Sequence, residues 1–247
     1  MSPSEDIYLV FEQTGLLEHI DRAIDLTKSE VSRLPATHPS RAQKLVDLAG
    51  QLKTRASRHR MTIGMELKEK DLRDAIKYSQ EATRLASTRN LIALSRSTTA
   101  SAILTLLDYF PNTQDYEKLY TLAETNITEA KKRMDSSDVI AYFHHWIEGR
   151  ICTENFEQLK VRSAALIGLR SFDTALRLLG KYDSKYSIIL MGKALLYALL
   201  YQQFGSQADK ENAKNSATEA IGASKVVWPV ERDETFLIWM RVTMILA

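Results

Sequence analysis

Cysteine, glycine and proline are all scarce in this 247-residue chain, and each scarcity excludes a class of protein. The one cysteine, Cys152, rules out a disulfide framework and makes a four-ligand zinc site unexpected. The 9 glycines and 5 prolines are well below average usage. Because sheet proteins need turns rich in these residues every few positions, the composition predicts long helices joined by few turns.

An excess of charge and a long hydrophobic run are also missing. The 33 basic and 31 acidic residues leave a net charge of +2, so we expect neither nucleic acid nor a membrane as partner. The N-terminus is acidic, where a signal peptide would be basic. The most apolar stretch, residues 186–201, is shorter than the roughly 20 residues that cross a bilayer, and this predicts a buried helix. These features favour a cytoplasmic protein.

Apolar residues recur at intervals of three and four, as expected of amphipathic helices. Three stripes show this period most clearly: Ile20, Ala23, Ile24, Thr27 and Val31; Leu72, Ala75, Ile76, Ser79 and Thr83; Tyr116, Leu119, Tyr120, Ala123, Ile127 and Ala130. Breaks between helices are predicted at Gly15, 35–39, 111–113, 180–184, Gly205–Ser206 and Trp228–Pro229. Residues 135–137 (Asp-Ser-Ser) are predicted to cap the start of a helix.

Similar helices follow one another in pairs along the chain. The segment 21–24 (Asp-Arg-Ala-Ile) recurs as 73–76 (Arg-Asp-Ala-Ile), and later helices repeat the apolar pattern. Each second helix carries a small residue near its middle, where helices would cross closely: Gly50, Ala100, Gly149 and Gly192. Stacked helix pairs bury a continuous core that one pair cannot bury alone. The pattern predicts about five pairs in one repeat domain over residues 1–247. A compact helical bundle is the alternative.

Two motifs resemble a known repeat family. The segment 11–15 (Phe-Glu-Gln-Thr-Gly), followed by Ile20 and 23–24, is similar to an F-E-R-T-G junction in long tetratricopeptide-like (TPR-like) repeats. The segment 38–42 (His-Pro-Ser-Arg-Ala), with the small and apolar residues after it, resembles the second helix of the same repeat. The close match covers about residues 8–58, and later repeats match only in helical period.

The resemblance implies an all-α fold, a right-handed α–α superhelix (a solenoid) of about five helix pairs. Such arrays occur in fungal and bacterial proteins, often beside a caspase-like CHAT protease domain or a nucleotide-binding signalling module. The residues that these modules use for chemistry are not found in this chain. The single cysteine lacks a glycine-rich context, and there is no G-x-x-x-x-G-K-[ST] loop.

The apolar C-terminal segment, residues 236–247, is unusual because repeat arrays generally end in a polar capping helix. Four explanations are open. The chain is a fragment of a longer array, a short relative of longer proteins, or one subunit of an oligomer in which a neighbour covers this helix. Alternatively, the last helix folds back onto its own core.

Candidate catalytic and metal-binding residues are few, and each has an ordinary structural interpretation. His145 and Glu148 have helical spacing but no third ligand, so we expect one histidine of His144 and His145 to pack beside Trp146 and the other to lie in solvent. Cys152 is expected in the core. Acidic pairs such as Asp71 and Asp74 are expected on solvated faces near helix starts. The D-D-x-x-D motif of all-helical terpenoid enzymes is absent. We therefore expect no catalytic residue, no metal and no cofactor.

One basic strip is the candidate binding site. Arg73, Lys77, Gln80 and Arg84 lie on one helical face, opposite the apolar stripe, with further basic residues upstream (Lys53, Arg55, Arg58 and Arg60). First helices of each pair usually line the concave side of a solenoid. On that reading the strip would bind an acidic peptide or a phosphate. An ordinary solvated face is the alternative interpretation.

The sequence thus predicts an interaction scaffold or adaptor that is not an enzyme and binds a partner peptide or helix in a concave groove. Two alternatives stay open. One is a regulatory segment of a larger signalling or CHAT-protease protein. The other is an all-α enzyme with an enclosed small-molecule pocket. Separately, the aromatic residues Tyr186, Tyr197, Tyr201 and Phe204 are expected to pack in the core, with a ligand pocket as the alternative.

Overall fold

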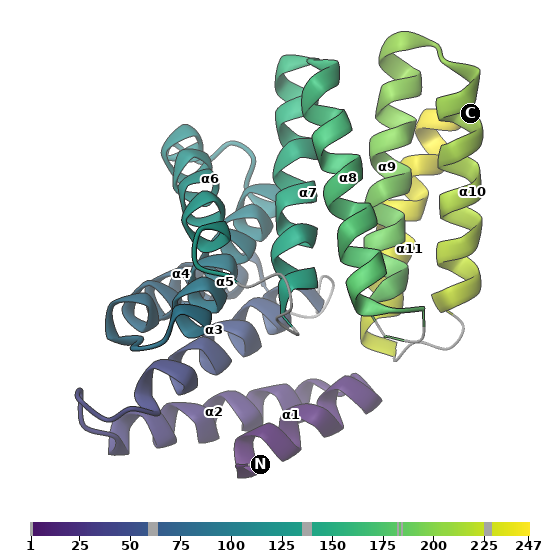
Figure 1. Ribbon diagram of the computed structural model, residues 1–247. Coiled ribbons are helices and arrows are strands. Elements are labelled where there is room, and N and C mark those ends of the chain that lie inside the picture. The colour runs from purple at the N-terminus through teal and green to yellow at the C-terminus, as the bar shows by residue number, and fades with distance from the viewer. Residues whose placement is uncertain (1, 59–63, 135–139, 182, 184, 225–228) are drawn as a thin grey trace. The chain divides into compact units, whose positions relative to one another are not determined.

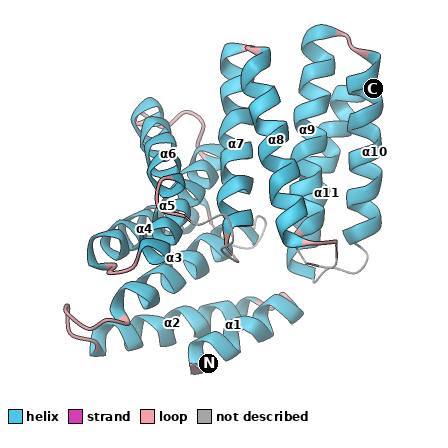
Figure 2. Cartoon of the chain, viewed as in Figure 1, coloured by secondary structure: helices cyan, strands magenta, loops and turns pink. Residues whose placement is uncertain are grey.

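The protein is entirely α-helical in the part that the structure describes. A computed structural model describes residues 2–58, 64–134, 140–181, 183, 185–224 and 229–247. Within these ranges it contains eleven helices, which make up 85% of the chain, and no strand (Figure 2). The all-α prediction is confirmed.

The helices fall into two compact units, residues 1–138 and 139–247 (Figure 1). Unit 1 holds six helices: α1 (Pro3–Thr14), α2 (Leu17–Arg33), α3 (Arg41–Arg58), α4 (Met65–Leu85), α5 (Arg89–Tyr109) and α6 (Tyr116–Lys131). Unit 2 holds five: α7 (Ala141–Leu159), α8 (Arg162–Leu179), α9 (Tyr186–Phe204), α10 (Gln207–Ser224) and α11 (Pro229–Leu246). A single repeat domain over 1–247 stays a prediction.

Helix ends lie where the sequence predicted the main breaks. Gly15 and Gly205 both adopt left-handed backbone, with φ of 69°, and end α1 and α9. Their N–H groups donate to the carbonyl oxygens of Phe11 and Tyr201, each at 2.7 Å. Left-handed φ is available to glycine at little cost, so glycine suits both positions. The predicted cap at 135–137 lies outside the described residues, as does the first residue of the Trp228–Pro229 break.

In unit 1 each helix packs against the next, and α3 also packs against α5. The predicted stripe of α2 is fully buried, from Ile20 to Val31. The stripe of α4 is buried from Leu72 to Ser79, with Thr83 half-buried at its end. That of α6 is buried from Tyr120 to Ala130, whereas Tyr116 and Leu119 before it are only half-buried. Helical periodicity therefore identified the buried faces of α2, α4 and α6.

In unit 2, α9 packs against α7, α8, α10 and α11. It is 19 residues long, and an 18-residue window in it has a mean hydropathy of 1.2, enough by length and composition to cross a membrane. However, 61% of that window is buried inside the protein, as in the core helix of a helical array. Helix α11 buries Thr235 and Val242 but leaves Phe236, Met240 and Met244 exposed.

Three pairs of odd-numbered helices contact each other in addition to their even-numbered neighbours: α3 with α5 in unit 1, and α9 with α7 and with α11 in unit 2. The even-numbered helices α4, α6, α8 and α10 pack against odd-numbered helices and leave their other sides exposed. This packing of adjacent helices is consistent with a helical solenoid.

Close crossings explain two of the four predicted small residues. A Cβ atom on Gly149 of α7 would lie 2.7 Å from the Phe172 ring of α8, and one on Gly192 of α9 would lie 3.2 Å from the same ring. Ala100 is fully buried in α5. At Gly50 in α3 the prediction of a close crossing is wrong, since a Cβ there would meet nothing within 4 Å.

Candidate partner-binding surface

A buried ion pair fixes the start of α4, the helix that carries the basic strip. The Nε and Nη2 atoms of Arg55 on α3 donate to the two carboxylate oxygens of Asp71 at 2.8 and 2.7 Å. Nη1 of Arg55 donates to Asp21 on α2 at 2.7 Å. Burial alone would lower the pKa of Arg55, but the hydrogen bonds to both carboxylates outweigh it and raise that pKa above its ordinary value. One guanidinium thereby joins three helices.

This ion pair corrects two predictions. Asp71 was expected on a solvated face, yet the residue is only 2% exposed. Arg55 was predicted to be one of the basic residues upstream of the strip, yet its guanidinium is bound to Asp71 and Asp21 inside unit 1. The side chains of the other two arginines of that group, Arg58 and Arg60, lie outside the described residues.

A second arginine couples the end of α2 to α4. Nη1 of Arg41 donates to the carbonyl oxygens of Val31 and Leu34, both at 2.7 Å, and so satisfies groups that the end of a helix leaves open. Its Nη2 lies 3.4 Å from a carboxylate oxygen of Glu81 on α4. Arg41 belongs to the His-Pro-Ser-Arg-Ala motif, so this part of the motif has a structural role here.

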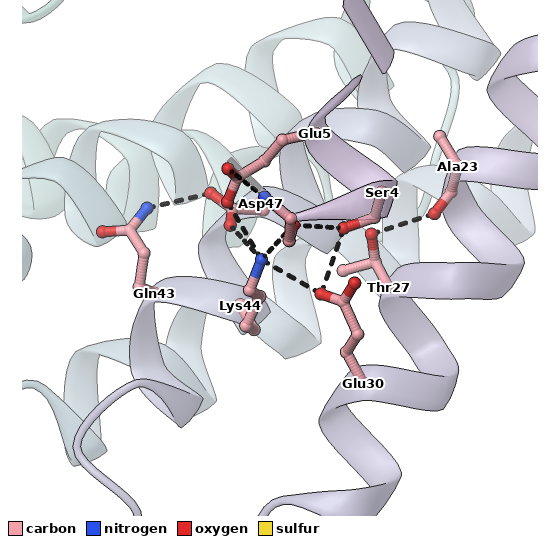
Figure 3. Close-up of polar contacts among 9 residues, drawn as sticks. Ser4, Glu5, Ala23, Thr27, Glu30, Gln43, Lys44 and Asp47 are labelled. Carbon is pink, nitrogen blue, oxygen red and sulfur yellow. Dashed lines mark hydrogen bonds and ion pairs between the residues drawn. The ribbon is translucent and has the colours of Figure 1, made fainter. Parts of the chain in front are cut away.

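Lys44 on α3 gathers polar groups from α1 and α2 (Figure 3). Its ammonium lies 2.9 Å from Glu5, 3.0 Å from Glu30 and 2.7 Å from the hydroxyl of Ser2. The hydrogen bond from Lys44 lowers the pKa of Glu5, whereas burial raises the pKa of Asp47, whose nearest carboxylate oxygen is 4.0 Å from the same ammonium. The cluster therefore holds the first three helices together by charge.

The basic strip itself lies along the outer side of α4. Arg73, Lys77 and Arg84 are exposed and Gln80 is half-buried, as expected of residues opposite the apolar stripe. Nε of Arg73 donates to Glu69, one turn earlier, at 2.8 Å, so its charge is partly neutralised. Lys77 and Arg84 make no ion pair with any residue that the structure describes. These two charges are the ones free to meet a partner.

Three of the five acidic residues of α4 are paired with arginines. Asp71 is buried with Arg55, Glu81 faces Arg41, and Glu69 is held by Arg73. Burial, and secondly the nearby Asp74 and Glu81, raise the pKa of Tyr78, which packs on the core between α2, α3 and α4. The position of the strip in a concave groove stays a prediction.

His145, Glu148 and Ser171 lie together but do not form a catalytic relay. The hydroxyl of Ser171 on α8 donates to Oε2 of Glu148 at 2.9 Å, and Nδ1 of His145 lies 3.4 Å from the same oxygen. A nucleophilic relay needs the histidine between the serine and the acid, whereas here the acid lies between the other two. His144 is buried, but His145 is half-buried and not in open solvent, contrary to the prediction.

Cys152 and the aromatic residues of α9 pack within unit 2. Cys152 is half-buried on α7, and its Cβ would be 2.8 Å from a Cβ on Gly168 of α8. The hydroxyl of Tyr186 donates to Glu219 on α10 at 3.0 Å; burial, together with this carboxylate, raises the pKa of Tyr186 to about 12. Tyr201 lies under the ammonium of Lys210 and Phe204 under Arg162. In the described part of the chain, no group of three or more His, Cys, Asp or Glu residues could hold a metal ion.

Comparisons with known proteins identify no relative. No family model matches the chain, and no curated protein or solved structure is detectably similar to it. The resemblance of residues 8–58 to long TPR-like repeats therefore stays a prediction, and the basic strip on α4 is assessed on its own geometry.

Proposed function

We propose that this protein is an interaction scaffold, a TPR-like right-handed solenoid of about five helix pairs, and that it acts in the cytoplasm without catalysing a reaction. The observation that supports this proposal best is the pattern of contacts between the helices. Helices α3, α5, α7, α9 and α11 contact other odd-numbered helices, whereas the even-numbered helices pack against odd-numbered ones and leave one side uncovered, where a partner could bind. A scaffold of this kind binds with little change in its own backbone.

The partner in this proposal is an acidic peptide or helix that contacts the strip on α4. Lys77 and Arg84 supply two charges with no ion pair among the described residues, and Arg73 can exchange Glu69 for a carboxylate of the partner. Guanidinium groups bind carboxylates through two parallel hydrogen bonds, which gives orientation as well as attraction. Because the strip is exposed, its contribution should weaken as salt is added.

Affinity capture from the native lysate, with quantitative mass spectrometry, tests the proposal. Wild-type protein is compared with Arg73→Glu plus Lys77→Glu and with Lys77→Glu plus Arg84→Glu, which leaves the Arg73–Glu69 pair intact. The control is Arg22→Glu plus Lys28→Glu, the same charge change on exposed positions of α2. We expect partners that both strip variants lose and the control keeps. The same partners in all four samples would discard the strip.

A further inference from the structure

Helix α8 exposes large aliphatic residues on its outer side. Its inner side packs small and aromatic residues against α7 and α9, with Gly168, Phe172 and Ala175 buried. On the opposite side three large aliphatic residues are exposed: Leu166 at 42%, Ile167 at 49% and Leu178 at 42%. We call these three, together with Arg170 and Arg177, the α8 face.

Among the even-numbered helices, only α4 exposes as many large hydrophobic residues as α8 in the part of the chain that the structure describes. Within the described residues, α2 and α6 expose no large hydrophobic side chain, and α10 exposes only Ile221. On α4 such residues lie at the ends: Met65, Leu67 and Leu85. On α8, Leu166 and Ile167 are adjacent and lie beside exposed arginines. Leaving such aliphatic side chains in water is unfavourable unless a partner covers them.

The two charged residues of the α8 face are both positive. Arg170 and Arg177 are exposed, lie seven residues apart on the same side of the helix, and form no ion pair with a described residue. The acid between them, Asp173, is bound by the ammonium of Lys193 on α9. Arg162, at the start of the helix, differs because it already has Asp209 and the ring of Phe204 as neighbours.

The arrangement suits an acidic amphipathic helix of another protein. From Leu166 to Leu178 the helix rises about 18 Å, and aliphatic side chains lie at both ends with the two arginines between them. We propose that the α8 face docks such a helix, whose aliphatic residues cover Leu166, Ile167 and Leu178 while its carboxylates pair with Arg170 and Arg177. This proposal concerns unit 2 and does not depend on the strip of α4.

A membrane surface is the less suitable occupant. Helices that lie on membranes usually combine several lysines or arginines with aromatic residues at the interface. The α8 face has two arginines, no lysine and no aromatic residue. Protein interfaces, in contrast, are enriched in arginine and depleted in lysine.

The test is a selection from a phage-displayed library of random 16-residue peptides, made against the full chain. We expect enriched peptides that carry Asp or Glu among aliphatic residues at helical spacing. By fluorescence anisotropy, an enriched peptide should bind at least roughly tenfold more weakly to Arg170→Glu plus Arg177→Glu, and also to Leu166→Ser plus Ile167→Ser. Both changes are on exposed positions, and circular dichroism confirms that each variant is folded. Lys214→Glu, an exposed change on α10, should bind normally.

Three results would overturn the proposal. The selection yields no enriched sequence, or the enriched sequences have no acidic bias, or their binding is the same in both α8 variants. A parallel arm measures co-sedimentation with vesicles of phosphatidylserine and phosphatidylcholine. Binding to these vesicles that requires Arg170 and Arg177, without any enriched peptide, would assign the α8 face to a membrane surface and reject a protein partner.

Discussion

Arg55 on α3 and Asp71 on α4 form a two-bond ion pair in the interior of unit 1, at 2.8 and 2.7 Å. The carboxylate side chain is only 3% exposed, and the guanidinium side chain 13%. Their neighbour Asp21 on α2 takes the remaining Nη1 donor. The orientation of α4, and with it of the basic strip, therefore depends on charge as well as on apolar packing.

Removing one partner of the Arg55–Asp71 ion pair should lower the free energy of unfolding more than replacing both partners with apolar residues. Asp71→Ala leaves a buried guanidinium with only Asp21, so we expect the free energy of unfolding to fall by about 3 kcal/mol. Urea titration followed by circular dichroism measures this. Asp74→Ala, one turn away and without a buried ion pair, should change stability by no more than about 0.5 kcal/mol. The double change Arg55→Met plus Asp71→Leu should lose less than Asp71→Ala alone, and a larger loss would contradict this account.

Lys44 should make stability depend on pH in a predictable direction. The lowered pKa of Glu5 means that its contribution is present above its ordinary value of 4.5 and is lost as the pH falls through the folded-state pKa. The raised pKa of Lys44 means that its own contribution is fully present below the ordinary value of 10.5 and is lost as the pH rises through the higher folded-state pKa. Both contributions are present at pH 7.

Lys44→Met keeps the aliphatic stem but leaves Glu5, Glu30 and Asp47 together without a cation. We expect a loss of about 1–2 kcal/mol at pH 7, measured by urea titration, that shrinks below pH 4.5 as the carboxylates become protonated. Lys28→Met on the exposed side of α2 serves as the control and should show no such pH dependence. A deficit that stays constant as the pH falls from 7 through the lowered folded-state pKa of Glu5 would show that the charge of Lys44 is not what matters.

Substitution by alanine should lower the stability of the protein at Gly149 and raise it at Gly50. Gly149→Ala would force a Cβ against the ring of Phe172, and we expect a loss of about 1–3 kcal/mol. Gly50→Ala adds a methyl group where nothing lies within 4 Å, so the higher helix propensity of alanine should stabilise α3 by up to about 1 kcal/mol. Thermal unfolding of the two variants compares them directly. Equal destabilisation by both would contradict the close crossing of α7 and α8.

The sequence could predict which residues become helical and which side of each helix is buried, because both follow from a local period. Ile20, Leu72 and Ala123 were assigned to the core from spacing alone, and all three are fully buried. Gly15 was read as a helix end for the same local reason. Residues that lie off the apolar stripe are then expected to be exposed, and this predicts that Lys77 and Arg84 lie on the surface.

What the sequence could not predict is which polar residues the packing brings together. From the sequence, Asp71 is an ordinary acidic residue near the start of a helix. Only the structure shows that Arg55, 16 residues earlier, packs against it and donates to its carboxylate. The α8 face was missed because its aliphatic residues adjoin the buried stripe, and Leu166 and Leu169 cannot be told apart by period. In the structure Leu169 is buried and Leu166 is exposed, since the neighbouring helices cover only one side.

A charge-exchange experiment on the partner of the α4 strip tests the central claim most directly. The acidic segment recovered by capture is synthesised, and its dissociation constant is measured by isothermal titration calorimetry with wild-type protein and with Lys77→Glu plus Arg84→Glu. We predict that the variant binds at least roughly tenfold more weakly, and that replacing the acids of the segment with lysine restores its binding to the variant. Equal affinity for wild type and variant, or no restoration by the exchanged segment, would contradict the claim that this protein recognises its partner through the charges of α4.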